Sequence, residues 1–212
     1  MKLLLNDRGK SYTEAQEYDG YLFPRKLGGQ ENINVSEFLA GLNDLTFKDD
    51  EVCIVSYPKS GTHWTYEICN MITTGSSDFI DTLMPIFDYS PKEELKDPQA
   101  RSRVYSSHFY PRHLPKQFME KRCKIIHVYR NPKDVAVSYF NFSKKLRTFD
   151  MEDMDFSEFL RHYTSGNGEV GDWKNHFTVA ENETFDKDME TILPELGLNI
   201  TCELPHKNSI RH

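Results

Sequence analysis

Residues 56–64 hold the side chains that an anion-binding loop needs. Lys59 supplies a positive charge, while Ser60 and Thr62 supply hydroxyl donors. Gly61 lets the main chain approach a ligand closely. At the start of a helix that follows such a loop, backbone N–H groups point at the ligand, and the helix dipole favours negative charge there. This combination predicts that the loop binds a phosphate or a sulfate.

The flanking sequence indicates a strand before the loop and a helix after it. The apolar run 52–55 is typical of a buried strand, and residues 65–73 are predicted to form the helix. Apolar side chains recur there at helical spacing, namely Trp64, Ile68, Met71 and Ile72. The loop departs from the Walker pattern, in which the lysine directly follows a glycine. An ordinary strand-to-helix turn that happens to contain a lysine is therefore the alternative interpretation.

A second strand-to-helix junction carries an arginine and a serine. Residues 124–129 are predicted to form a strand, and Pro132 suits the first position of a helix. Arg130 then lies at the end of the strand, and Ser138 lies along the helix. Parallel α/β sheets bind ligands beyond the carboxyl ends of their strands, where an arginine fork can hold a phosphate. Residues 121–147 contain eight basic residues against one acid, and a solvated basic helix face is the other explanation for that excess.

The composition bounds the class of protein. A chain of 212 residues is long enough for one sizeable α/β core, and its net charge of −7 argues against nucleic-acid binding. No apolar run is long enough for a signal peptide or a membrane span, so we expect a cytoplasmic protein without a membrane partner. The cysteines are widely spaced, so we expect no metal site and expect three of them to be buried thiols. They are Cys53, Cys69, Cys123 and Cys202.

Together, the two junctions resemble the cytosolic sulfotransferases, which transfer a sulfuryl group from 3′-phosphoadenylyl sulfate (PAPS) to an alcohol, phenol or amine. The resemblance rests on residues 57–64, 130–139 and 168–178. It implies a three-layer α/β fold with a parallel sheet and a P-loop-like loop for the phosphosulfate, without a metal. Residues 1–185 are then expected to form a single domain, followed by a divergent tail over 186–212.

The resemblance also implies roles for the residues that match. Lys59 would neutralise charge on the leaving phosphate, and Trp64 would lie beside the adenine. Most family members have a threonine where this chain has His63, so a hydroxyl contact is lost. The residues implied for the 5′-phosphosulfate are Lys59, Ser60, Gly61, Thr62, His63 and Trp64. Those implied for the 3′-phosphate are Arg130 and Ser138, with Gly168 as a backbone donor.

His108 is the candidate base of the implied reaction. It ends the alternating segment 103–107, which is typical of a strand, and an imidazole near neutrality can accept a proton. The matching position of the family carries the base that deprotonates the acceptor, which then attacks sulfur in line. Positioning and charge neutralisation would supply most of the catalysis. Many members carry a lysine two residues before the base, where this chain has Ser106.

An internal gap separates this chain from the family pattern. A sizeable segment with a strand, several helices and part of the acceptor pocket is replaced by the short join at 163–167. We therefore expect an incomplete sheet and a weaker hold on the 3′-phosphate. The chain is either a working sulfotransferase of small molecules or a catalytically impaired relative that dimerises or binds nucleotide weakly. A P-loop phosphotransferase is a third alternative, but the Walker pattern that it needs is missing.

A possible homodimer contact lies near the C-terminal end of the resemblance. The family's short dimerisation motif is matched at Lys174, Thr178, Val179 and Glu183. Lys174 opposite Glu183 of a second copy would form the self-complementary patch that a two-fold contact needs. An ordinary surface loop is the alternative interpretation.

The remaining segments carry weaker signals. Residues 1–50 show no strong core pattern, although 36–45 are predicted to form a short capped helix. Residues 79–91 are expected to form a loop on the acceptor side.

Overall fold

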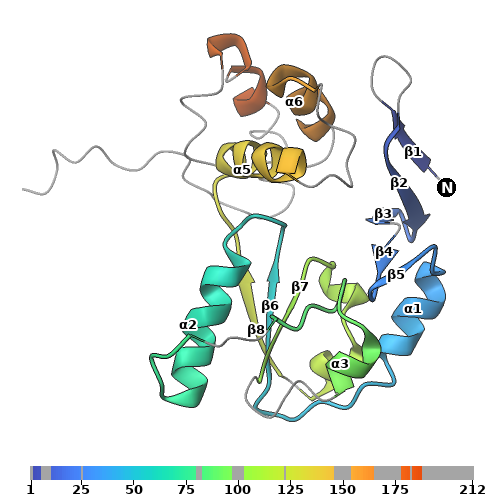
Figure 1. Ribbon diagram of the computed structural model, residues 1–212, viewed down its shortest axis with the longest axis vertical. Helices are drawn as coiled ribbons and strands as arrows, with labels where there is room; N and C mark the ends of the chain where they lie inside the picture. The colour runs from blue at the N-terminus through green and yellow to red at the C-terminus, as the bar shows by residue number, and fades with distance from the viewer. Residues whose placement is uncertain are drawn as a thin grey trace, which may run out of the picture. The chain divides into compact units, whose positions relative to one another are not determined.

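The computed structural model divides the chain into two compact units, labelled by element in Figure 1. The first comprises residues 1–129 and 148–150, and the second comprises residues 130–147 and 151–212. The expectation of a single domain over 1–185 stays a prediction. The described residues are 2–5, 11–24, 26–79, 83–96, 103–121, 123–145, 154–164, 178–181 and 183–187.

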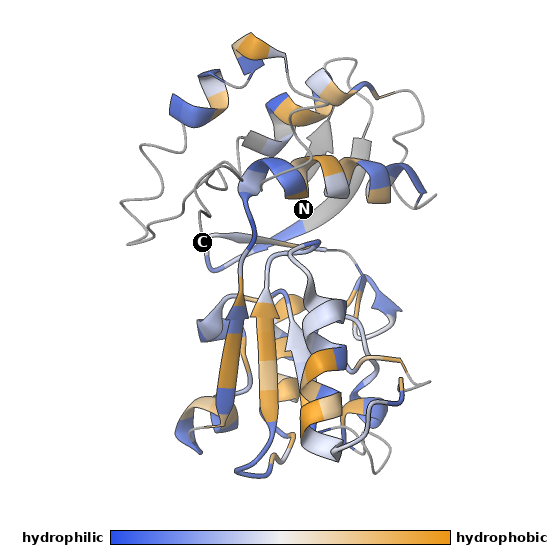
Figure 2. Cartoon of the chain, turned by 90° about the vertical axis from the view of Figure 1, so that its left-hand side faces the viewer, coloured by the Kyte–Doolittle hydropathy of each residue, from blue (hydrophilic) through white to orange (hydrophobic). Residues whose placement is uncertain are grey.

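A three-stranded parallel sheet forms the centre of the first unit, in the order β7-β6-β8. β6 is buried and largely hydrophobic, whereas β8 mixes polar with apolar residues (Figure 2). Val55 pairs with Ser107 and Ser56 pairs with Val128, so the three strands end at the same edge. The expected parallel α/β architecture is confirmed. The strand bounds are Val52–Ser56 for β6, Val104–Ser107 for β7 and Lys124–Val128 for β8.

Helix α2 (Thr62–Thr74) follows β6 and packs against β6 and β7. The predicted helix is confirmed, but it begins three residues earlier than expected. Its buried face includes Tyr66 and Cys69. Most of the apolar stripe that predicted the helix lies on the opposite face and is exposed, comprising Trp64, Ile68 and Ile72. The spacing therefore identified the helix correctly without identifying the side that packs on the sheet.

The N-terminal part of the first unit contains two antiparallel sheets and a helix. The first sheet contains β1 (Lys2–Leu5), β2 (Ser11–Tyr18) and β3 (Tyr21–Pro24). The second contains β4 (Lys26–Leu27) and β5 (Gln30–Glu31). Helix α1 (Val35–Leu42) corresponds to the helix predicted over 36–45. The side chain of Asn34 caps it by accepting a hydrogen bond from the Glu37 N–H at 3.2 Å.

The main hydrophobic core of the first unit contradicts the expectation that residues 1–50 lack a core pattern. Side chains from this segment, including Phe23, Leu27 and Phe47, belong to the core and are almost fully buried. Phe47 packs against the rings of Tyr105 and Phe118, with centroids 5.4 and 4.4 Å away. Apart from three residues of helix α1, the buried side chains of this segment come from very short strands and connecting loops, which leave no periodic pattern.

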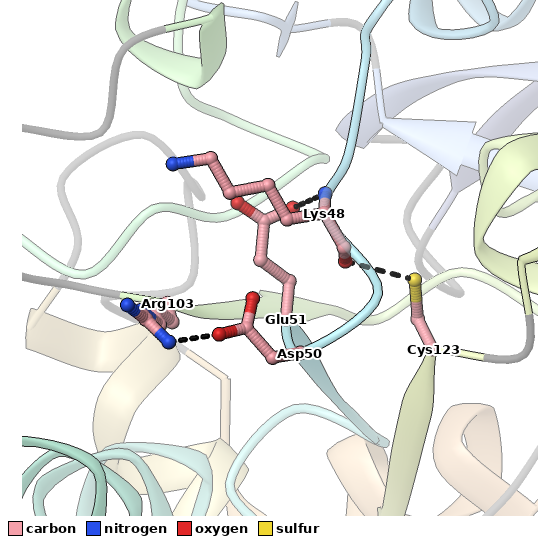
Figure 3. Close-up of polar contacts among 5 residues, drawn as sticks. All are labelled: Lys48, Asp50, Glu51, Arg103 and Cys123. Carbon is pink, nitrogen blue, oxygen red and sulfur yellow. Dashed lines mark hydrogen bonds and ion pairs between the residues drawn. The ribbon is translucent and has the colours of Figure 1, made fainter.

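Polar contacts join the starts of the three parallel strands (Figure 3). Glu51 accepts the Lys48 N–H at 2.7 Å, and the Lys48 carbonyl accepts the thiol of Cys123 at 3.5 Å. Arg103, just before β7, forms an ion pair with Asp50. Burial raises the pKa of the Glu51 carboxyl, and the contact with Lys48 opposes this shift. These contacts fix the edge of the sheet opposite to the strand ends that carry the candidate site.

Three of the cysteines are buried free thiols, as expected. Burial raises the pKa of each thiol, so these side chains behave as small apolar residues. They are Cys53, Cys69 and Cys123. Cys202 lies outside the described residues. The remaining short elements of the first unit are α3 (Lys92–Lys96), the 3-10 turn η1 (Pro111–His113) and α4 (Lys116–Glu120).

The second unit is built on helices α5 (Pro132–Lys145) and α6 (Phe156–Thr164), which pack together. The helix predicted to begin at Pro132 is confirmed. The ring of Phe140 lies 5.4 Å from Phe156 and 5.3 Å from Phe159, between centroids. Residues 179–181 and 183–187 are also helical. Aromatic packing therefore holds the helix that carries Ser138.

Two glycines with left-handed backbone allow a matched test of the core packing in the first unit. Gly28 has φ 54° and Gly20 has φ 78°, so alanine is strained at both. An added Cβ would lie 2.6 Å from the Phe38 ring at Gly28 but would meet nothing within 4 Å at Gly20. We expect Gly20→Ala to lower the free energy of unfolding by about 1–2 kcal/mol. Gly28→Ala should lower it by about 2–4 kcal/mol, because overpacking adds to the strain. Urea unfolding measures both, and equal losses would contradict the described packing.

Candidate active site

The loop between β6 and α2 has the backbone of an anion-binding turn. Lys59 has φ 74°, an uncommon conformation for a residue with a side chain, and Gly61 has φ 109° at the N-cap of α2. The Ser60 N–H donates to the Tyr57 carbonyl at 3.2 Å and closes the turn. The first N–H groups of α2 have no acceptor within the helix itself. Strained backbone of this kind concentrates at functional sites.

Ser56, at the end of β6, holds the start of α2 against the strand. Its hydroxyl lies 2.6 Å from the hydroxyl of Thr62, and both side chains are buried. The Thr62 hydroxyl therefore contacts Ser56, whereas the sequence suggested that it serves a ligand. The backbone N–H of Thr62, at the first position of α2, is a further donor that an anion could use. His63 and Trp64, which follow it, are exposed, and Trp64 is 77% exposed.

Ser56 also orients His108. The strand predicted before this histidine is confirmed as β7, and the His108 Nδ1 atom lies 2.7 Å from the Ser56 carbonyl oxygen. A carbonyl oxygen can only accept a hydrogen bond, so Nδ1 carries the proton. In the neutral ring Nε2 then has the free lone pair that a general base needs. The Tyr89 ring flanks the imidazole, with 6.4 Å between centroids.

Asp88 is a buried carboxylate next to His108 that the sequence analysis did not identify. Its carboxylate oxygens accept the backbone N–H of His108 at 3.0 and 3.1 Å and the Ser107 hydroxyl at 2.9 Å. Burial raises the pKa of Asp88, and the charge of His108 and these hydrogen bonds oppose the shift. The position lay in a segment expected to be a loop, where no local pattern distinguishes a buried acid from a solvated one.

Ser106, where many family members carry a lysine, is fully buried in β7. Its hydroxyl donates to the Pro85 carbonyl at 3.2 Å. A lysine here would need a route to solvent, since burying an ammonium without a partner is costly. The buried surroundings of Ser106 therefore suit its small hydroxyl and would not suit the longer, charged side chain of a lysine.

The second unit carries the residues expected for a 3′-phosphate. Arg130 lies 3.7 Å from Asp134, measured from Nε to Oδ2, and Ser138 is half-buried on α5. Lys133 is buried, forms an ion pair with Asp186 and lies 5.8 Å from the centre of the Phe185 ring. This pair ties the start of α5 to the helical segment 183–187. Lys133 therefore has a structural role, while Arg130, two residues before α5, is exposed.

Part of the predicted dimer motif is described. The Thr178 hydroxyl and N–H both donate to the Glu181 carboxylate, at 2.7 and 2.8 Å, and Val179 is 76% exposed. Glu183 is exposed as well. Gly168, Lys174 and the join at 163–167 fall mostly or wholly outside the described residues, so the predictions made for them stay predictions.

Comparison with known proteins identifies the family. The family model for the sulfotransferase domain matches residues 49–168, more than half of the chain. The chain is 32% identical over 169 residues to 3-beta-hydroxysteroid sulfotransferase of Cavia porcellus, covering 70% of this chain and 58% of that protein. It is 32% identical over 198 residues to flavonol 3-sulfotransferase of Flaveria bidentis, covering 85% and 61%. A solved mouse sulfotransferase complexed with PAP matches with a TM-score of 0.56 and 27% identity, covering 88% and 70%.

The chain belongs to the sulfotransferase family, as its motifs predicted. It spans only about three fifths of the length of the two curated relatives, 58% and 61%. Within the described part of the chain, no helix combines the length and hydrophobicity needed to cross a bilayer.

The two glycines that flank α2 separate a binding role from a structural one. Gly61 has φ 109° and Gly75 has φ 68°, and an added Cβ meets nothing within 4 Å at either position. Alanine at each should lower the free energy of unfolding by about 1–2 kcal/mol through backbone strain alone. Only Gly61→Ala should also weaken binding of adenosine 3′,5′-bisphosphate (PAP), because it distorts the anion-binding turn. Titration calorimetry alongside thermal unfolding tests this, and equal affinities for the two variants would argue against the assigned turn.

Proposed function

We propose that this chain is a PAPS-dependent sulfotransferase that acts on a hydroxyl or amine of a small molecule. The observation that carries the proposal is the double contact of Ser56, which joins the anion-binding turn to the imidazole of His108. A group bound at the turn and a base oriented from the same strand end are the two parts that the reaction requires. The names of the relatives, which refer to a steroid and a flavonol, support a small hydroxyl-bearing acceptor.

PAPS, when bound, supplies an activated sulfuryl group. The turn fits such a group because its glycine, its lysine and the start of α2 together offer backbone donors and a positive charge. The assigned contacts of the 5′-phosphosulfate are Lys59, Ser60, Gly61, Thr62, His63 and Trp64. Those of the 3′-phosphate are Arg130, Ser138 and the backbone of Gly168, of which Arg130 offers two parallel hydrogen bonds.

The chain's own residues have distinct tasks in this proposal. His108 accepts the acceptor's proton at Nε2 while its Nδ1 stays bonded to Ser56. Lys59 neutralises negative charge that develops on the phosphate side. Hydrogen bonds from the start of α2 hold the anion in place, so positioning supplies much of the rate.

The alternative is a relative that binds nucleotide but transfers sulfate poorly. The observation in its favour is length, since the chain spans 58% and 61% of the two curated relatives. A shorter chain has fewer elements with which to enclose an acceptor and exclude water.

We also propose that the protein is cytoplasmic and that it forms a homodimer through Lys174, Thr178, Val179 and Glu183. The exposed side chain of Val179 supports the dimer, because an apolar residue at a two-fold contact becomes buried there. Val179→Glu should convert the dimer to a monomer in sedimentation velocity. A wild-type chain that sediments as a monomer at tens of micromolar would refute the dimer.

Nucleotide binding and turnover distinguish the two functions. We expect PAP to bind the wild-type chain with micromolar affinity. Arg130→Ala should weaken the binding free energy of PAP by about 1.5–3 kcal/mol, the value of hydrogen bonds to a charged group. Lys145→Ala, at the exposed last residue of α5, is the control and should bind normally. Absence of heat for the wild type would refute the assigned donor site.

Turnover is measured as transfer of radiolabelled sulfate to a panel of phenols, steroids and amines. Lys59→Ala should slow the transfer by raising its activation free energy by about 2.7–4 kcal/mol, as expected for loss of one well-placed donor. Normal PAP binding with no transfer to any acceptor would favour the impaired relative.

A further inference from the structure

We infer that Asp88 is a positioning residue for His108, holding the backbone of the base in place and balancing the positive charge that the imidazole acquires. The inference rests on the proposed function, because it gives a purpose to His108 as the base. It concerns a residue that neither the anion-binding turn nor the family motifs include.

The carboxylate of Asp88 organises the end of β7. It accepts the His108 N–H at 3.0 and 3.1 Å and the Ser107 hydroxyl at 2.9 Å. The Ser107 hydroxyl oxygen in turn accepts the Phe109 N–H at 3.0 Å. Three consecutive residues therefore take their conformation from one carboxylate. The base is the central residue of the three.

Asp88 is itself held firmly. Ile86 forms a parallel bridge with Ser106, and the Phe87 N–H donates to the Ser106 carbonyl at 2.9 Å. The Asp88 carbonyl accepts the Gly28 N–H at 2.9 Å, from the turn between β4 and β5. The residue is 2% exposed. Segments distant in sequence thus fix a charged side chain that has little freedom to move.

The imidazole is held at two points as a result. Asp88 fixes the backbone of His108, while the Ser56 carbonyl fixes Nδ1 of the ring at 2.7 Å. Nε2 remains as the nitrogen that can take up a proton. When it does so, the new positive charge acts on the buried carboxylate, whose pKa is lowered by the charge of His108, and the low dielectric strengthens the attraction. Other ionisable groups nearby are Cys53, whose thiol pKa is raised by burial and by Asp88, and Tyr89, whose ring flanks His108.

The stability of the fold does not explain this acid. Burial raises the pKa of Asp88, with opposing contributions from His108 and Ser107. A folded pKa above the unfolded value gives stability that is present at low pH and is lost as pH rises through the folded pKa. Ionised Asp88 therefore destabilises the fold near neutrality relative to a neutral group of the same shape. An asparagine would keep an acceptor for the His108 N–H without that effect.

The test compares Asp88→Asn with Asp78→Asn, an exposed acid of the first unit. At pH 7 we expect Asp88→Asn to unfold no more easily than wild type and to bind PAP within twofold of it. Its kcat/KM should fall by about 10–100-fold, because the imidazolium that forms on proton transfer loses its negative neighbour. The acid limb of its pH–rate profile should move to lower pH, because the reacting centre loses a negative neighbour. Asp88→Glu should restore part of the activity, and Asp78→Asn should match wild type.

Separate outcomes test the inference and the function it rests on. A folded Asp88→Asn with wild-type turnover and an unmoved pH–rate profile would overturn the positioning role. If Asp88→Asn does not fold, Ser107→Ala provides the test of the positioning role, because it removes one hydrogen bond to the same carboxylate. That variant should leave PAP binding intact but lower kcat/KM severalfold with a shifted profile, and an unchanged profile would overturn the inference. Transfer that survives His108→Ala would instead refute the base assigned under the proposed function.

Discussion

The hydrogen bonds made by Ser56 are the constraint on which the candidate site depends. Its hydroxyl lies 2.6 Å from Thr62 at the start of α2, and its carbonyl lies 2.7 Å from Nδ1 of His108. One residue at the end of a buried strand thus sets both the entry to the anion-binding turn and the tautomer of His108, the proposed base. Because β6 is buried along its length, Ser56 has little freedom to shift. The precise placement that the proposed catalysis requires would therefore come from the rigidity of the sheet.

The parallel register of the sheet explains why these groups meet. Val55 pairs with Ser107 and Ser56 pairs with Val128, so three strand ends form one edge. At the other edge, contacts of Glu51 and Cys123 with the turn at Lys48 hold the strand starts together. Ligands of α/β proteins gather where strands end, because the loops that follow point away from the packed sheet. Here that edge supplies a lysine, hydroxyls, a helix N-terminus and an imidazole from segments far apart in sequence.

Local sequence patterns predicted the parts of this site that depend on neighbours in the chain. The strand, the turn at Lys59 and the helix after it follow from a contiguous run, and the start of α5 follows from Pro132. Asp88 could not be predicted in this way, because its role depends on the bridge between Ile86 and Ser106, which lie in different segments. The same limit applies to the core formed by residues 1–50. Apart from those of helix α1, its side chains come from strands and loops too short to show a period, and only the tertiary structure brings them together.

Lys133 and Asp88, each 2% exposed, illustrate different electrostatic solutions. Lys133 is paired with Asp186, so its charge is balanced in the resting fold. The opposite charge that acts on Asp88 is that of His108, which carries it only after taking up a proton. Among the described residues, buried Asp88 has no opposite charge beside it while His108 is neutral, but it has one once His108 is protonated. It therefore stabilises the state after proton transfer more than the state before it. That difference, and not tighter binding at every stage, is what lowers a barrier. A buried acid beside a base is therefore most useful where it makes the resting fold slightly less stable.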